Sequence, residues 1–105
     1  MPLQIDPTEG GYRLEGELDL ATSEHLLTAI RGWSGGGEPL TLDFSGVTFM
    51  DSSGLRALLE AARNRMDGDL LVILDPTPQV RRVLDISLPD GAPGLQVRGG
   101  EETTP

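Results

Sequence analysis

The chain has 105 residues, of which 37% are hydrophobic and 24% charged, and its formal net charge is −9. These values are typical of one small globular domain rather than of a disordered chain. The acidic balance argues against binding to nucleic acids or to anionic membrane surfaces, and it favours a partner with a basic patch. The sequence has no cysteine, which excludes disulfides, a thiol nucleophile and a cysteine-based metal site.

Nothing in the sequence predicts a membrane span or a signal peptide. The longest apolar run, Leu70–Leu74, is far too short to cross a bilayer. The first residues, MPLQIDPTEGG, have neither the basic start nor the apolar stretch of a signal peptide. We therefore expect a cytoplasmic protein with no membrane contact.

Polar and apolar residues alternate at the start of the chain, which predicts two half-buried strands, Leu3–Asp6 and Tyr12–Leu18. We expect Pro7–Gly11 to connect them as an antiparallel pair. Asp19 ends the second strand and is a candidate helix N-cap.

The next segment has the spacing of an amphipathic helix. Its apolar residues recur on one helix face, and they are Leu26, Leu27, Ile30 and Trp33. Gly32 and Gly35–Gly37 are expected to end this helix. Leu40–Phe44 then alternates as a strand, and Ser45–Gly46 is expected to be a short connector that leads on to Met50.

A second amphipathic helix is predicted directly after Met50. Its apolar stripe consists of Leu55, Leu58, Leu59, Ala62 and Met66. Gly68 stands where a left-handed cap would end the helix. Leu70–Leu74 is apolar without alternation, which predicts a parallel strand covered on both faces.

The last third of the chain predicts a short helix and a final strand. Thr77 followed by Pro78 is typical of an N-cap and a first helical turn. The buried side of this helix is expected to be Val80, Val83 and Leu84. Leu95 and Val97 predict the last strand, and residues 99–105 are expected to form a disordered tail.

This order of elements predicts a single α/β domain over residues 1–98. Strands that alternate with helices favour a mixed, mostly parallel β-sheet with an N-terminal antiparallel hairpin, flanked by helices.

The segment Asp51-Ser52-Ser53-Gly54 lies where a strand is expected to become a helix. Asp and Ser side chains at such a position commonly accept hydrogen bonds from free backbone N–H groups, so plain capping is the commoner role. The same position also stabilises added negative charge, so a phosphate on Ser52 would be tolerated by the fold. Arg56, four residues further on, could reach such a phosphate.

Three segments resemble the sulphate-transporter and anti-sigma-factor-antagonist (STAS) family. They are GELDLAT (residues 16–22), LDFSGVTFMDSSGLRALL (residues 42–59) and VRRVLDISL (residues 80–88). The likeness is greatest to the bacterial anti-sigma factor antagonists of that family. It implies that Ser52 is phosphorylated by a partner that is both anti-sigma factor and serine kinase, with Ser53 as second choice. The unphosphorylated form would bind that partner and free the sigma factor.

The resemblance also implies a kinase of the GHKL type as the partner and a PP2C-type phosphatase that resets the cycle. The residues expected to form the partner-binding surface are Asp19, Thr22, Asp51, Ser53, Gly54, Leu55 and Arg56. For several of these a structural role is the alternative: Asp19 as N-cap, Asp51 in an Asx turn, Gly54 in the turn itself and Leu55 in the core.

The sequence departs from the family pattern after Leu88. Pro89–Gly94 replaces a shorter connection, and the C-terminal helix that many relatives carry is missing.

An enzyme is not expected. His25 is the sole histidine and lies off the apolar stripe of its helix, so a Ser-His-Asp triad is not expected, and no pattern predicts a metal or cofactor site. One alternative to the antagonist is a constitutive STAS subunit of a larger assembly, such as a lipid-transport ATPase complex or a stressosome-like particle. Another is a structural domain in which Ser52 is merely a helix cap.

Overall fold

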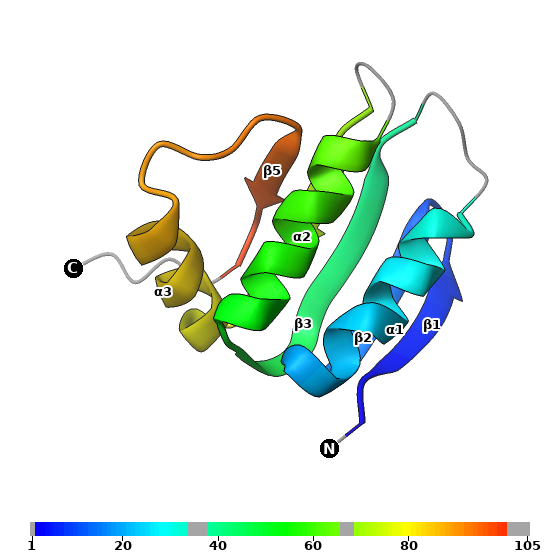
Figure 1. Ribbon diagram of the computed structural model, residues 1–105, viewed down its shortest axis with the longest axis horizontal. Coiled ribbons are helices and arrows are strands. Elements are labelled where there is room, and N and C mark those ends of the chain that lie inside the picture. Colours follow the sequence, from blue (N-terminus) through cyan, green and yellow to red (C-terminus); the bar gives the residue numbers. More distant parts are fainter. Residues whose placement is uncertain (1, 34–37, 66–68, 101–105) are drawn as a thin grey trace.

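The computed structural model describes residues 2–33, 38–65 and 69–100, which form a five-stranded sheet and three helices (Figure 1). In chain order the elements are β1 (Gln4–Thr8), β2 (Gly11–Leu18), α1 (Leu20–Arg31), β3 (Leu40–Met50), α2 (Ser52–Asn64), β4 (Leu71–Leu74), α3 (Pro78–Ser87) and β5 (Leu95–Arg98).

The strands lie in the order β1-β2-β3-β4-β5. β1 and β2 pair antiparallel, and every later pair is parallel, which confirms the predicted α/β architecture. Parallel neighbours need a crossover connection, and here each of the three parallel connections contains a helix: α1, α2 and α3 in turn. No helix in the described segments is long and apolar enough to cross a membrane.

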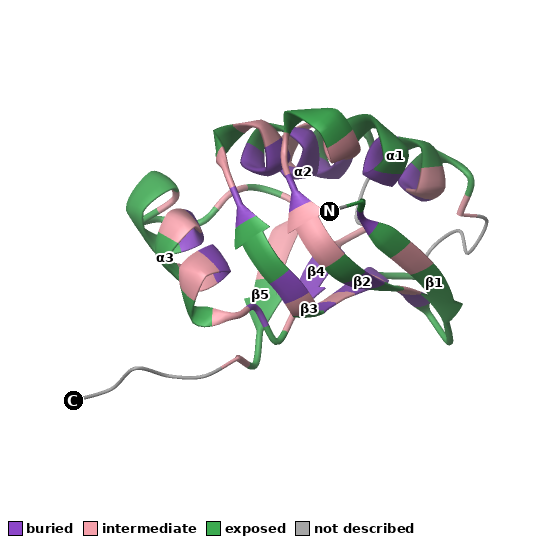
Figure 2. Ribbon diagram, turned by 90° about the horizontal axis from the view of Figure 1, so that it is seen from below, coloured by how far each residue is buried: buried purple, intermediate pink, exposed green. Residues whose placement is uncertain are grey.

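The helices α1 and α2 lie side by side over one face of the sheet, and α3 lies beside α2 toward β5 (Figures 1 and 2). Apolar side chains of the sheet meet the helices in a single core whose largest fully buried members include Phe44, Leu14, Leu18, Leu26 and Leu58. On β1 and β2 the opposite face is polar: Gln4, Asp6, Arg13 and Glu15 are all exposed.

The first hairpin is tighter than the sequence suggested. Thr8 pairs with Gly11 and Pro7 pairs with Tyr12, so only Glu9 and Gly10 form the turn. Pro7 was expected in the connector, but it lies within β1. A proline is tolerated there because β1 is an edge strand, whose outer side needs no backbone donor.

The prediction that Ser45–Gly46 is a connector was wrong, because both residues lie inside an unbroken β3 of 11 residues. Gly46 pairs with Glu15 of β2, and the β2–β3 register shifts once on each side of this point. A serine-glycine pair is a turn signal in isolation, but here it marks an irregular strand that bends against its neighbour.

The helices follow the predicted stripes with small differences at their ends. α1 ends at Arg31 with Gly32 as its C-cap, so Trp33 lies beyond the helix and is half-buried against the core. α2 buries Leu55, Leu58 and Ala62 as expected, whereas Leu59 is only partly buried. Gly35–Gly37, Met66 and Gly68, on which other predictions fell, lie outside the described residues.

The C-terminal elements are confirmed. β4 is buried between β3 and β5, and α3 buries Val80 and Leu84, with Val83 partly covered. At the start of the expected tail, the Gly100 N–H donates to Asp75 and the Gly99 carbonyl accepts from Arg81. Residues 101–105 lie outside the described part of the chain.

Candidate functional site

The site lies where β2 and β3 end side by side and each leads into a helix. Leu18 pairs with Met50 at the last position of both strands, and the Asp51 N–H donates to the Leu18 carbonyl at 3.3 Å. The residue after each strand, Asp19 or Asp51, is an N-cap, and α1 and α2 begin directly after these caps. The β2–β3 pairing therefore brings two acidic helix starts to one edge of the sheet.

Asp51, rather than Ser52, caps α2. One carboxylate oxygen of Asp51 accepts from the N–H groups of Ser53 at 2.9 Å and Gly54 at 3.1 Å. These bonds satisfy two of the donors that a helix N-terminus leaves free. The alternative in which Ser52 serves as the cap is therefore wrong, and the Asp51 carboxylate does not orient the Ser52 hydroxyl by a hydrogen bond.

Ser52 is the first residue of α2, and its side chain is exposed. Within the described part of the chain, its hydroxyl has no hydrogen-bond partner. Ser53 is half-buried, so Ser52 is the more accessible of the two candidate phosphorylation sites. Arg56, one helical turn after Ser52, is exposed.

Gly54 and Leu55 lie beneath this surface and are both buried. A Cβ atom on Gly54 would stand 2.6 Å from the Leu18 carbonyl oxygen and 2.9 Å from the Met50 side chain. The close approach that Gly54 permits is therefore between α2 and the ends of β2 and β3 in the same chain.

Asp19 and Thr22 form a reciprocal capping box. The Asp19 Oδ1 atom accepts from the Thr22 N–H at 3.1 Å, and the Thr22 hydroxyl accepts from the Asp19 N–H at 3.0 Å. The Thr22 hydroxyl also donates to the Glu17 carbonyl at 2.8 Å, so it is engaged inside the chain. The second carboxylate oxygen of Asp19 is not used by the cap.

Three residues near this edge, Leu20, Thr77 and Gln79, could not be assigned to it from the sequence alone. Leu20, the first residue of α1, is 77% exposed beside Asp19, although its spacing of seven from Leu27 assigns it to the buried stripe. Thr77 and Gln79 of the α3 start bond to the backbone of β3. No sequence signal identifies these three hydrogen bonds, each of which joins residues 29 or 30 positions apart.

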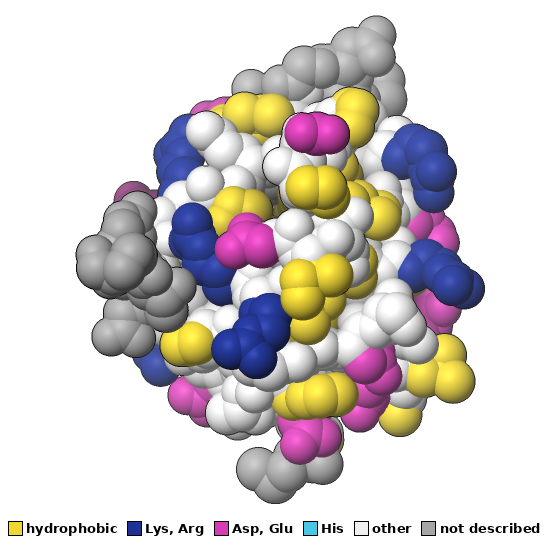
Figure 3. All heavy atoms as spheres, turned by 90° about the vertical axis from the view of Figure 1, so that its left-hand side faces the viewer, with side chains coloured by type: hydrophobic (Ala, Val, Ile, Leu, Met, Phe, Trp, Pro, Cys, Tyr) yellow, Lys and Arg dark blue, Asp and Glu magenta, His cyan; other side chains and the backbone are white. Residues whose placement is uncertain are grey.

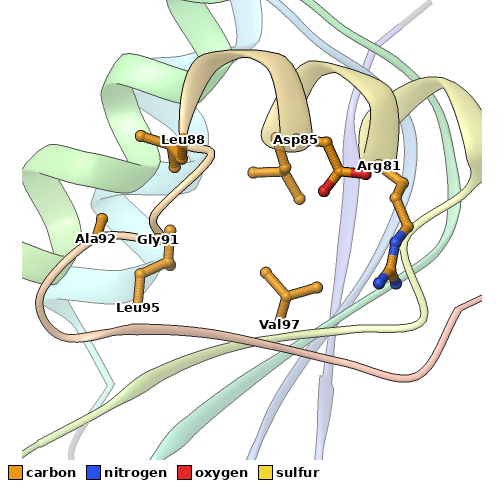
Figure 4. A pocket seen from close by; sticks show the side chains of 8 residues that line it. Arg81, Asp85, Leu88, Gly91, Ala92, Leu95 and Val97 are labelled. Carbon is orange, nitrogen blue, oxygen red and sulfur yellow. The ribbon is translucent and has the colours of Figure 1, made fainter.

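The described residues hold no cluster of three or more His, Asp or Glu side chains that suits a metal ion. His25 is exposed on α1, as expected. The hollow between α3 and β5 holds about 80 Å³, with Leu84, Leu88, Leu95 and Val97 in its walls and Arg81 and Asp85 nearby (Figure 4). Pockets for substrates or cofactors are several times larger.

The face that carries α3 has hydrophobic side chains gathered along it, with arginine and acidic side chains around them (Figure 3). Ile86 of α3 is 74% exposed, and it borders a shallow groove together with Pro78, Arg82 and Val83.

Comparisons with known proteins agree with this architecture. A family model described as "Mlab, STAS domain" matches residues 1–95. Among curated proteins there is no significant match.

Two solved structures share the fold. The anti-sigma factor antagonist SpoIIAA in its unphosphorylated form matches with a TM-score of 0.58 and 24% identity, over 97% of this chain and 89% of SpoIIAA. The murine anion transporter Solute Carrier 26 family member A9, in its inward-facing state, matches with a TM-score of 0.62 and 22% identity. That match covers 86% of this chain but 16% of the transporter.

Proposed function

Because the chain belongs to the STAS domain family, we propose that it is an anti-sigma factor antagonist of a bacterial cytoplasm. It binds an anti-sigma factor that is also a GHKL-type serine kinase, and this binding frees the sigma factor for transcription. Phosphorylation of Ser52 by the same partner ends the binding, and a PP2C-type phosphatase restores it. The chain itself is regulatory, and the kinase supplies the chemistry.

The observation that carries this proposal is the state of Ser52. Its side chain is exposed at the first position of α2, and its hydroxyl is not engaged by any described residue. A kinase can therefore bind and phosphorylate this hydroxyl without breaking a hydrogen bond of the fold. Ser53 is the second choice because it is less exposed.

The proposed switch works by charge at a helix start. A phosphate adds roughly −1.5 to −2 charges, which the free N–H groups and the dipole of α2 stabilise. The added charge would join the Asp19 and Asp51 carboxylates at the same edge of the sheet, with Arg56 one helical turn away on α2. At a desolvated contact that fits the unmodified hydroxyl, the bulk and the unpaired charge of the phosphate would break the fit to the kinase, while the fold stays intact.

The proposed contact surface includes the residues that are accessible at this edge: Asp19, Leu20, Asp51, Ser52, Ser53 and Arg56. Gly54 and Leu55 are buried, so we assign them to the support of the turn. Thr22 acts through the capping box that holds Asp19. The free carboxylate oxygen of Asp19 suits a basic group on the kinase.

The proposal is tested by intact-mass analysis of the chain after incubation with ATP, Mg²⁺ and a GHKL-type kinase from the same genome. The wild type and Ser53→Ala should each gain one phosphate, and Ser52→Ala should gain none. If Ser52→Ala took up as much phosphate as the wild type, the phosphorylated residue would be one other than Ser52. No uptake by the wild type with any such kinase would contradict the switch.

A Ser52→Asp variant mimics part of the added charge. We expect it to bind the kinase about 30-fold or more weakly, which corresponds to roughly 2 kcal/mol at a desolvated interface. Its circular dichroism and melting temperature should match those of the wild type. Undiminished affinity in a calorimetric titration would refute the charge mechanism.

A second candidate function is that of a constitutive subunit in a larger assembly, without a phospho-switch. Two observations favour it: the matching family model bears the name Mlab, and the same fold forms 16% of an anion transporter. A pull-down from the native organism separates the two functions. The antagonist should recover a GHKL-type kinase, whereas an assembly subunit should recover ATPase and permease subunits.

A further inference from the structure

The strand that leads to Ser52 extends well beyond its neighbour β4. β4 pairs with Leu40–Asp43 only, whereas β3 continues to Met50. On the β2 side this second half of β3 is paired up to Met50. On the β4 side it has no strand partner in the described structure, so its backbone groups there need other partners.

The first turn of α3 takes the place of the missing strand. The Thr77 hydroxyl donates to the Val47 carbonyl at 2.8 Å. The Gln79 side-chain oxygen accepts from the Met50 N–H at 2.9 Å, and its NH2 group donates to the Met50 carbonyl at 3.0 Å. A side-chain amide carries the same donor and acceptor as a peptide group, so Gln79 pairs with Met50 as a strand residue would.

We propose that Gln79 is a positioning residue for Ser52, which it holds in place through Met50. Met50 lies two residues before Ser52 and is held by Leu18 on one side and by Gln79 on the other. The next residue, Asp51, bonds to Leu18 and caps α2. The consequence for phosphorylation rests on the proposed function, but the positioning itself does not.

We call the three hydrogen bonds from Thr77 and Gln79 to β3 the clamp. Its physical effect is to order the turn before a partner binds. A loop that is already fixed in its bound conformation loses less entropy on binding, so it binds more tightly. Without the Gln79 amide, the Met50 N–H and carbonyl both lose the hydrogen bonds that they make to it. The turn from Asp51 to Gly54 would then open more often than the rest of the sheet.

Two substitutions remove the clamp and one serves as the control. Gln79→Met keeps the length of the side chain but neither donates nor accepts as an amide does. Thr77→Val keeps the shape and removes the bond to Val47. Gln96→Met makes the same chemical change on β5, where the side chain of Gln96 accepts from Arg98 and from no other described residue.

Amide hydrogen exchange of the free protein tests the positioning. In Gln79→Met, the N–H groups of Ser53 and Gly54 should exchange about tenfold faster, while those of Leu71–Leu74 stay within about twofold of wild type. Thr77→Val should show a smaller change in the same place, and Gln96→Met none. Unchanged exchange at Ser53 and Gly54, or an equal rise in Leu71–Leu74, would overturn the proposal.

Phosphorylation kinetics test the consequence. With the kinase that modifies the wild type, Gln79→Met should raise KM about tenfold and leave kcat within about twofold. The reason is that a less ordered turn loses more entropy when it binds, whereas the bound geometry is unchanged. An unchanged KM despite faster local exchange would contradict the link to Ser52. If the wild type takes up no phosphate, the proposed function fails, and the exchange measurement still decides whether Gln79 holds the turn.

Discussion

Asp51 and Ser52 are adjacent polar residues at one helix start, yet the structure gives them different roles. Asp51 accepts two backbone N–H bonds, whereas the Ser52 hydroxyl bonds to no described residue. The cost of removing each side chain should therefore differ.

We expect Asp51→Ala to lower the free energy of unfolding by about 1 kcal/mol, the usual cost of losing an N-cap. Ser52→Ala should change it by less than about 0.5 kcal/mol, as for an exposed side chain without partners. Urea denaturation of both variants measures the two values. If Ser52→Ala were as costly as Asp51→Ala, the serine would be structural after all.

Residues at this edge also mark what the sequence could and could not predict. Asp19 as a helix cap follows from local chemistry, because a carboxylate before an amphipathic segment satisfies nearby N–H groups. Ser52 as the candidate site followed from a family resemblance. Gln79 could not be predicted, since its partner Met50 lies 29 residues away and only the folded sheet brings them together.

At the scale of elements, the contact between α2 and the ends of β2 and β3 depends on the absence of a side chain at Gly54. A methyl group there would overlap the Leu18 carbonyl, which belongs to the backbone and has little room to move. We expect Gly54→Ala to cost about 1–3 kcal/mol, the typical range for overpacking.

Gly32→Ala is the matched control for this substitution. Gly32 has a φ of −84°, and the nearest atom to an added Cβ would lie at 3.5 Å. The free energy of unfolding of Gly32→Ala should stay within about 0.5 kcal/mol of wild type. Thermal melts of both glycine variants and the wild type measure the two effects. A Gly54→Ala variant as stable as Gly32→Ala would mean that α2 can move away from the strands at no cost.

The elements themselves were largely predictable, because alternation and helical spacing report burial directly. The buried run Leu71–Leu74 and the stripe of α2 illustrate this. Where pairing between distant strands overrode a local signal, prediction failed. Ser45–Gly46 resembles a turn in sequence, but the register with Glu15 and Gly16 keeps it in β3.

At the scale of the whole molecule, the net charge of −9 affects the rate at which a partner associates. We expect the association rate with the proposed kinase to fall about five- to tenfold as NaCl rises from about 50 to about 300 mM, because salt screens long-range attraction. Stopped-flow mixing measures this rate. A rate that does not depend on salt would argue for a mainly apolar contact.

Asp19→Asn separates charge from capping in this measurement. Asparagine caps a helix about as well as aspartate, so the stability should stay within about 0.5 kcal/mol. Association should nevertheless slow and depend less on salt, because one negative charge leaves the contact surface. A variant that associates as fast as wild type would remove Asp19 from the proposed surface.

The polar side of the sheet, which no helix covers on β1 and β2, offers a way to observe the molecule at work (Figure 2). Gln4 is exposed there, across the sheet from α1 and α2, and the sequence contains no native thiol. A cysteine introduced at Gln4 would accept a single fluorophore on the face of the sheet opposite α1 and α2. Docking and release of a partner could then be followed in real time on an otherwise unaltered chain.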